Sequence, residues 1–104
     1  MIYYYQKEGT TPKEKELMTM YTITFCNKNN ERTDFCEFGL LEGEHFLDKL
    51  EEVLYIMQEL TPCKNRCSWA FPFLRGEAVR FTYRNCEFVT IQLMDNKKII
   101  VKDI

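Results

Sequence analysis

Residues 44–60 read EHFLDKLEEVLYIMQEL, and their periodicity decides the fold that we predict. At about 100° per residue, one half of the helical wheel collects the apolar side chains Phe46, Leu47, Leu50, Val53, Leu54, Ile56, Met57 and Leu60. We expect a helix that begins after Gly43 and stops at Thr61-Pro62, because the residue before a proline disfavours helical geometry. Such a helix is stable when its apolar half covers a sheet.

A β-hairpin is expected before this helix. Apolar and polar residues alternate over 19–26 and again over 33–41, as they do in strands with one buried face. The asparagine-rich segment between the two runs tolerates the positive φ angles of a turn, and we place the tight turn at Asn29 and Asn30. The resulting cross-strand pairs are Ile23 with Cys36 and Tyr21 with Phe38.

Four more strands are expected after the helix. The first covers 67–73, where apolar residues alternate, and Pro72 indicates an edge strand because proline cannot donate a ladder hydrogen bond. Turn signals at Asn85 and at Asp95-Asn96 divide the remaining chain into strands at 78–84, 87–94 and 98–103. Their alternation gives the sheet one apolar face and one polar, basic face.

The predicted fold class is α+β with the order β-β-α-β-β-β-β. It is an antiparallel sheet of about five or six strands with the amphipathic helix at 44–60 packed on one face. The 104 residues, of which 45% are apolar, fit a single globular domain over 1–104. Residues 1–16 are the least patterned part, and we expect them to be loosely attached to that domain.

Charge is sorted by region, although the whole chain carries a formal net charge of −2. Residues 31–60 hold nine acidic and two basic residues, whereas residues 61–104 hold eight basic and four acidic ones. On the predicted fold, the acids gather on the exposed side of the helix and the bases on the exposed side of the sheet. Two oppositely charged surfaces would face away from each other, and each could orient a partner of complementary charge.

The exposed half of the helix is the first candidate site. Its carboxylates repel one another with few compensating lysines, whereas solvated helix faces usually mix both signs. Tyr55 falls in the middle of these acids, as an apolar anchor inside a charged rim would. This acidic helix face comprises Asp48, Glu51, Glu52, Tyr55, Gln58 and Glu59. A face that only keeps the helix solvated is the simpler alternative.

The exposed side of the sheet is the second candidate site. Its cations are Arg80, Arg84, Lys98 and Lys102, and we refer to it as the basic sheet face. Tyrosine and phenylalanine residues nearby in the sequence would suit a platform for RNA or single-stranded DNA. The acidity of the whole chain argues against a general nucleic-acid binder.

The sequence offers no convincing catalytic constellation, so we expect a protein without enzymatic activity and without a cofactor. His45 is the one histidine and falls on the polar half of the helix, and the four glycines form no phosphate-binding loop. Cys63 and Cys67 are four residues apart, but the second ligand pair of a structural zinc site is missing. No metal site is predicted, and metal binding by these two thiols stays an open alternative.

These observations favour a small protein-interaction domain. Its most concrete form is an inhibitor or immunity-type protein that uses the acidic helix face to occlude the basic surface of a nucleic-acid-processing enzyme, with carboxylates in the place of phosphates. Binding of RNA or single-stranded DNA on the basic sheet face is the alternative. The oligomeric state is not indicated by the sequence.

The chain is expected in the cytoplasm and away from membranes. No apolar run approaches the about 18 residues of a membrane span, and the first residues lack the pattern of a signal peptide. The five cysteines, odd in number and irregularly spaced, are then expected to be reduced thiols.

Overall fold

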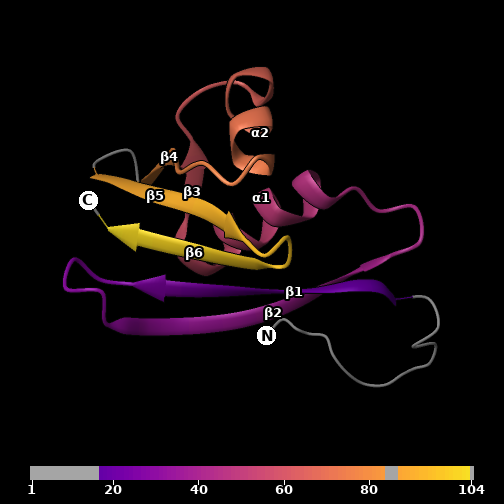
Figure 1. Cartoon of the computed structure of the whole chain (residues 1–104), viewed down its shortest axis with the longest axis horizontal. Helices are drawn as coiled ribbons and strands as arrows, with labels where there is room; N and C mark the ends of the chain where they lie inside the picture. Colours follow the sequence, from indigo (N-terminus) through magenta and orange to yellow (C-terminus); the bar gives the residue numbers. More distant parts are fainter. Residues whose placement is uncertain (1–16, 84–86, 104) are drawn as a thin grey trace.

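The computed structural model describes residues 17–83 and 87–103 of the chain (Figure 1). In this part, six strands and two helices follow one another in the order β1 (Leu17–Cys26), β2 (Arg32–Leu41), α1 (Phe46–Gln58), β3 (Leu60–Pro62), α2 (Arg66–Leu74), β4 (Val79–Tyr83), β5 (Glu87–Met94) and β6 (Lys98–Asp103). The mixture of strands and helices confirms the α+β class. The segment at 1–16 and the turn predicted at Asn85 lie outside the described residues.

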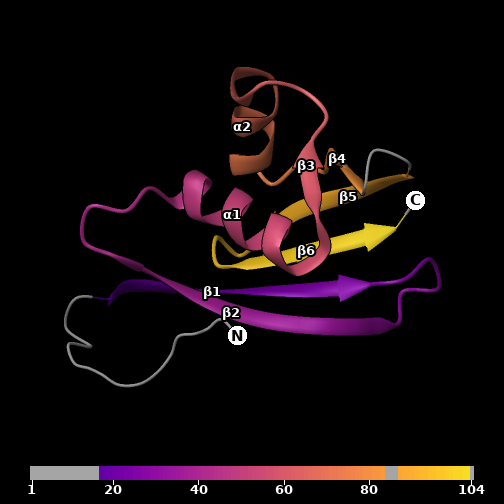
Figure 2. The same ribbon diagram turned by 180° about the vertical axis from the view of Figure 1, so that it is seen from behind.

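All six strands form one sheet with the order β2-β1-β6-β5-β4-β3. Neighbouring strands are antiparallel except β1 and β6, which run parallel in the middle of the sheet. The prediction of an entirely antiparallel sheet is therefore wrong at this pairing. α1 carries the chain from the edge strand β2 to the opposite edge strand β3, and three reversals then bring β6 beside β1 in the same direction (Figure 1; Figure 2).

The β1–β2 hairpin has the predicted register from Tyr21 to Phe25, but a bulge then pairs Cys26 with Arg32, and the two-residue turn predicted at Asn29 and Asn30 is a longer loop. Its cross-strand pairs include Ile23 with Cys36 and Tyr21 with Phe38. The chain reverses over 27–31, where Asn30 adopts a φ of 64° that asparagine tolerates better than most residues. The ring of Tyr21 stacks on Phe46 of α1 with a centroid distance of 4.4 Å. Aromatic packing therefore fixes the hairpin against the start of the helix.

The hydrophobic core lies between the two helices and one face of the sheet. Buried side chains come from both helices and from all six strands. The largest fully buried ones are Phe73, Phe81, Ile23, Leu50, Leu54, Ile91 and Ile99. No layer of described residues covers the opposite face of the sheet, which carries the polar and basic positions of the predicted alternation.

Helix α1 is shorter than the predicted helix at 44–60. It spans Phe46–Gln58, and Glu59 ends it by adopting a left-handed conformation with a φ of 55°. Leu60–Pro62 then forms the edge strand β3, so the chain has left the helix before the proline is reached. The position of Pro62 on an edge strand leaves no internal ladder bond unmade.

Helix α2 replaces the strand predicted at 67–73. The side-chain oxygen of Asn65 accepts a hydrogen bond from the Ser68 amide at 3.0 Å and caps the helix. Trp69 and Phe73, four residues apart, are both buried, which is the spacing of a helix face. Pro72 lies near the end of α2, where the helix stops two residues later. The apolar alternation was misleading because a short run fits both periodicities.

The two helices are short. α1 has 13 residues and α2 has 9, and no helix in the described part of the chain is long and apolar enough to span a membrane.

Candidate interaction surfaces

The acidic helix face points away from the core, but its six residues do not form one exposed patch. Asp48, Glu52, Tyr55 and Glu59 are exposed, whereas Glu51 and Gln58 are half-buried. Glu51 turns toward α2, and Gln58 lines a cavity below the end of α1. The predicted site is thus divided. Asp48 and Glu51 form the half beside α2, and we call Glu52, Tyr55 and Glu59 the outward half.

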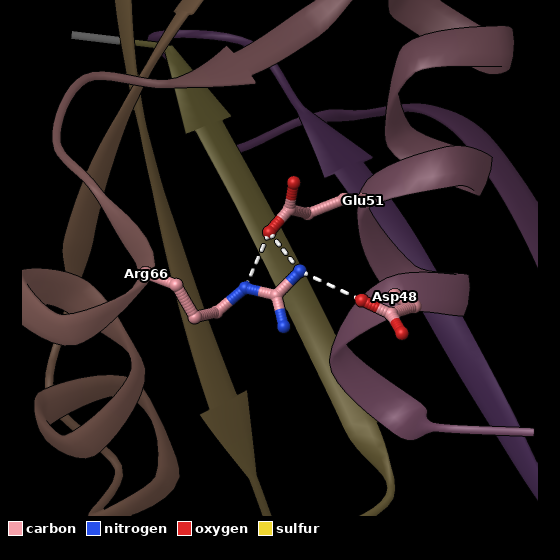
Figure 3. Close-up of polar contacts among 3 residues, drawn as sticks. All are labelled: Asp48, Glu51 and Arg66. Atoms are coloured by element: carbon pink, nitrogen blue, oxygen red, sulfur yellow. Dashed lines mark hydrogen bonds and ion pairs between the residues drawn. The ribbon is translucent and has the colours of Figure 1, made fainter.

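Arg66, the first residue of α2, pairs with the half of the acidic helix face beside it (Figure 3). Its Nε donates to Glu51 Oε2 at 2.7 Å, and its Nη2 lies 2.9 Å from Asp48 Oδ1. The hydrogen bond to Asp48, and then the hydrogen bond and charge of Glu51, raise the pKa of the guanidinium above its ordinary value. The positive charge of Arg66, which an arginine carries at any ordinary pH, neutralises part of the acidic helix face.

The sequence predicted that few positive charges compensate the repulsion among these carboxylates, and this prediction is wrong for Asp48 and Glu51. Arg66 lies 18 residues after Asp48 and 15 residues after Glu51, so the spacing rules for one helix could not reveal it. The Arg66 side chain is 37% exposed, and such a pair contributes at most about 1 kcal/mol to the free energy of unfolding. Its main effect is to join α1 to α2.

The outward half of the acidic helix face gains an apolar neighbour. Tyr55 is 56% exposed, and Ile56, predicted on the apolar half, is 60% exposed. Ile56 lies four residues after Glu52, so these two share one face of the helix, and Glu59 is the left-handed residue at its C-terminal end. No ion pair among the described residues involves Glu52. In the sequence, the exposure of Ile56 is indicated by its position at the edge of the apolar half of the helical wheel.

The basic sheet face lies on the uncovered side of the sheet. Arg80, Lys98 and Lys102 are exposed there, and Arg84 lies outside the described residues. Sequence reasoning missed two exposed rings on the same side, Phe35 and Phe88. An arginine lies over each ring: the Cζ of Arg32 is 5.6 Å from the Phe35 centroid, and that of Arg80 is 5.1 Å from the Phe88 centroid.

A cavity of about 170 Å³ opens at the end of the sheet where α1 stops. Its lining residues include Phe25, Gln58, Leu60, Glu87, Val89 and Val101. Among the described lining residues, Glu87 is the charged one and there is no histidine. His45 is exposed at the other end of α1, so the described residues bring no acid–base pair together in this cavity.

The four cysteines within the described residues are free thiols. Cys63 and Cys67 are exposed, and no group of three potential metal ligands occurs among the described residues. Partial burial, with the charges of Asp34 and Glu37, raises the pKa of the Cys36 thiol to about 11. Cys36 therefore stays protonated near neutral pH and is a poor nucleophile.

The comparisons with known proteins place this chain in no family. A scan against protein-family models found no match, and searches of curated proteins and of solved structures found no significantly similar chain.

Proposed function

We propose that this protein is a small, non-enzymatic interaction domain that binds a basic surface of another protein through the outward half of the acidic helix face. The contact would centre on Tyr55 and Ile56 and be ringed by Glu52 and Glu59. The single observation that supports it is the exposure of two large apolar side chains of α1, 56% and 60%, near the carboxylates of Glu52 on that helix and of Glu59 at its C-terminal end. Apolar anchors inside a charged rim are typical of protein interfaces.

The partner that fits this surface is a protein with an apolar pocket inside a basic patch. Lysine and arginine residues of the partner would pair with Glu52 and Glu59, while its pocket receives Tyr55. Basic patches of this kind occur on enzymes that hold nucleic acid, where carboxylates can occupy the places of phosphates. Inhibition of such an enzyme by occlusion is the concrete form of the proposal.

A reducing cytoplasm is the compartment that we propose for this interaction. The four described cysteines are free, and two of them, Cys63 and Cys67, are exposed. Exposed thiols persist where the glutathione and thioredoxin systems keep them reduced.

The proposal is tested by affinity capture from the native cell lysate after nuclease treatment. The bait carries Glu52→Lys with Tyr55→Ala, which reverses one charge and removes the anchor. We expect the affinity for the captured protein to fall at least about 10-fold relative to the unmodified chain, since a central aromatic anchor is a typical hot spot. The purified partner, if it is a nucleic-acid enzyme, should also be inhibited by the unmodified chain and not by this variant.

The matched control carries Glu42→Lys with Phe71→Ala. It makes the same change in charge and also removes an exposed aromatic ring, but in the turn after β2 and on α2. Loss of capture in the control, or full capture by the Glu52→Lys, Tyr55→Ala variant, would contradict the assignment of the interface to α1.

A further inference from the structure

Three cations lie in one cross-strand row on the uncovered side of the sheet. Arg80 on β4 pairs with Thr90 on β5, and Thr90 pairs with Lys102 on β6. Lys102 pairs with Cys26 on β1, whose other neighbour is Arg32 on β2. Because neighbouring strands are about 4.8 Å apart, the backbone positions of successive cationic residues in this row are separated by about 10 Å. The row therefore crosses five strands with a positive charge on every second one.

Exposed aromatic rings lie on both sides of this cation row. Phe88 is 46% exposed and pairs with Thr82, two residues beyond Arg80, so it lies on the same face. Phe35, 43% exposed, lies on β2 three residues after Arg32. The guanidinium contacts with these rings, at 5.1 and 5.6 Å, hold each arginine beside a flat apolar surface.

The basic sheet face carries mostly positive charge. Lys98 adds a fourth cation, and Glu37 is the acidic residue on this face within the described strands. None of the ion pairs among the described residues involves Arg80, Lys98 or Lys102. These charges are available to an external anion, and the acids of α1 lie on the other side of the sheet.

We infer that this face binds single-stranded nucleic acid across the strands. The phosphates would follow the row formed by Arg32, Lys102 and Arg80, and unstacked bases would rest on Phe88 and Phe35. Cations that track a backbone together with rings that receive bases are the two elements of sequence-tolerant single-strand binding. A duplex hides its base faces, so its binding would use the cations alone. This inference is independent of a protein partner on α1.

The first test is a titration of the full chain with a fluorescently labelled oligothymidine of about 12 nucleotides, similar in length to known single-strand sites. Affinity is measured by anisotropy at several salt concentrations. We expect the logarithm of the association constant to fall with the logarithm of salt concentration with a slope of about −2, since each of three phosphates contributes about −0.7. In Arg80→Ala with Lys102→Ala, the slope should shrink to about −0.7.

The matched control is Lys64→Ala with Arg75→Ala, which removes two exposed cations near the ends of α2 instead. Its slope should stay at about −2. An equal loss in both double variants would overturn the inference, because it would mean that the oligonucleotide follows net charge and not the row. Absence of binding at low salt would overturn it as well.

The second test separates stacking from charge. Phe88→Ala should weaken oligothymidine binding by about 5-fold or more, the lower end of the contribution of one base stack, without changing the salt slope. Phe71→Ala, which removes an exposed ring on α2, should leave binding unchanged. Unaltered affinity in Phe88→Ala, or equally tight binding of a thymidine–adenosine duplex, would overturn the inference. Capture of a protein by this face without binding of the oligonucleotide would also overturn the inference.

Discussion

The exposed face of α1 and the uncovered face of the sheet carry opposite charges, but they differ in how the protein treats those charges. On α1, Asp48 and Glu51 are paired with Arg66 of the neighbouring helix. On the sheet, Arg80 lies over an aromatic ring and enters none of the described ion pairs. A regional excess of charge in a sequence therefore marks a surface for a partner only where no distant residue of the same chain has neutralised it.

Both faces are built on the same hydrophobic core, so a substitution that destabilises the core should affect both of them. Phe73 is fully buried and packs against Phe46 of α1 and Trp69. Phe73→Ala is expected to lower the free energy of unfolding by about 3–5 kcal/mol, because it leaves a large cavity between helix and sheet. Urea denaturation followed by circular dichroism measures this change, the largest that we predict.

Phe71→Ala, two residues away on the exposed side of α2, is the control and should change the free energy of unfolding by less than about 0.5 kcal/mol. Similar losses in the two variants would show that α2 does not pack on the sheet as described.

Cys36 of the hairpin tests how well the helix-covered face of the sheet is buried. Cys36 points to the helix-covered side, and its burial, then the charges of Asp34 and Glu37, raise its pKa to about 11. At about pH 8 its alkylation by iodoacetamide should be about 10-fold slower in the native protein than in urea, because the lower thiolate fraction outweighs the higher nucleophilicity. Mass spectrometry of the alkylated peptides gives both rates.

The same pKa shift fixes the sign of a pH effect. Because the folded protein binds the Cys36 proton more tightly than the unfolded chain, the stabilisation is complete below the ordinary thiol pKa of 9.0 and is lost as the pH rises through about 11. Cys36→Ala should lessen this alkaline loss of stability. Equal alkylation rates in native and unfolded protein would contradict the burial of the thiol.

Removal of Arg66 should sharpen the contrast between the two faces. Arg66→Ala frees Asp48 and Glu51 and makes the exposed side of α1 more acidic. We expect a loss of at most about 1 kcal/mol in the free energy of unfolding, since the pair is partly exposed. Affinity for a lysine-rich peptide, measured by calorimetry, should rise by a few-fold at low salt. Unchanged peptide affinity would mean that α1 does not attract cations.

Local patterns predicted the parts of the fold that depend on neighbouring residues. The strict alternation in both strands predicted the cross-strand pairs of the hairpin, since a shift of one residue would have moved every side chain to the other face, whereas the turn itself was placed one residue too late. Alternation likewise separated the buried side of β4, β5 and β6 from its basic side. The wheel position of Tyr55 predicted its exposure, whereas its role in binding stays a prediction.

Two of the wrong predictions concern contacts between residues far apart in the sequence. The parallel pairing of β1 with β6 joins residues more than 70 positions apart, and strand patterns do not identify neighbours. The ion pairs of Arg66 cross from one helix to the next. α2 was missed for a local reason, because the Asn65 cap and the spacing of Trp69 and Phe73 compete with an alternation that also fits a strand.

Amide chemical-shift mapping by NMR can show whether the two faces bind independently, the acidic one a cationic ligand and the basic one an anionic ligand. The labelled protein is titrated with oligothymidine and, separately, with a lysine-rich peptide that contains one aromatic residue. We expect the oligonucleotide to shift the amide signals around Arg80, Thr90 and Lys102, and the peptide to shift those around Glu52 and Tyr55. Overlapping shifts from both ligands, or shifts from neither, would contradict this expectation.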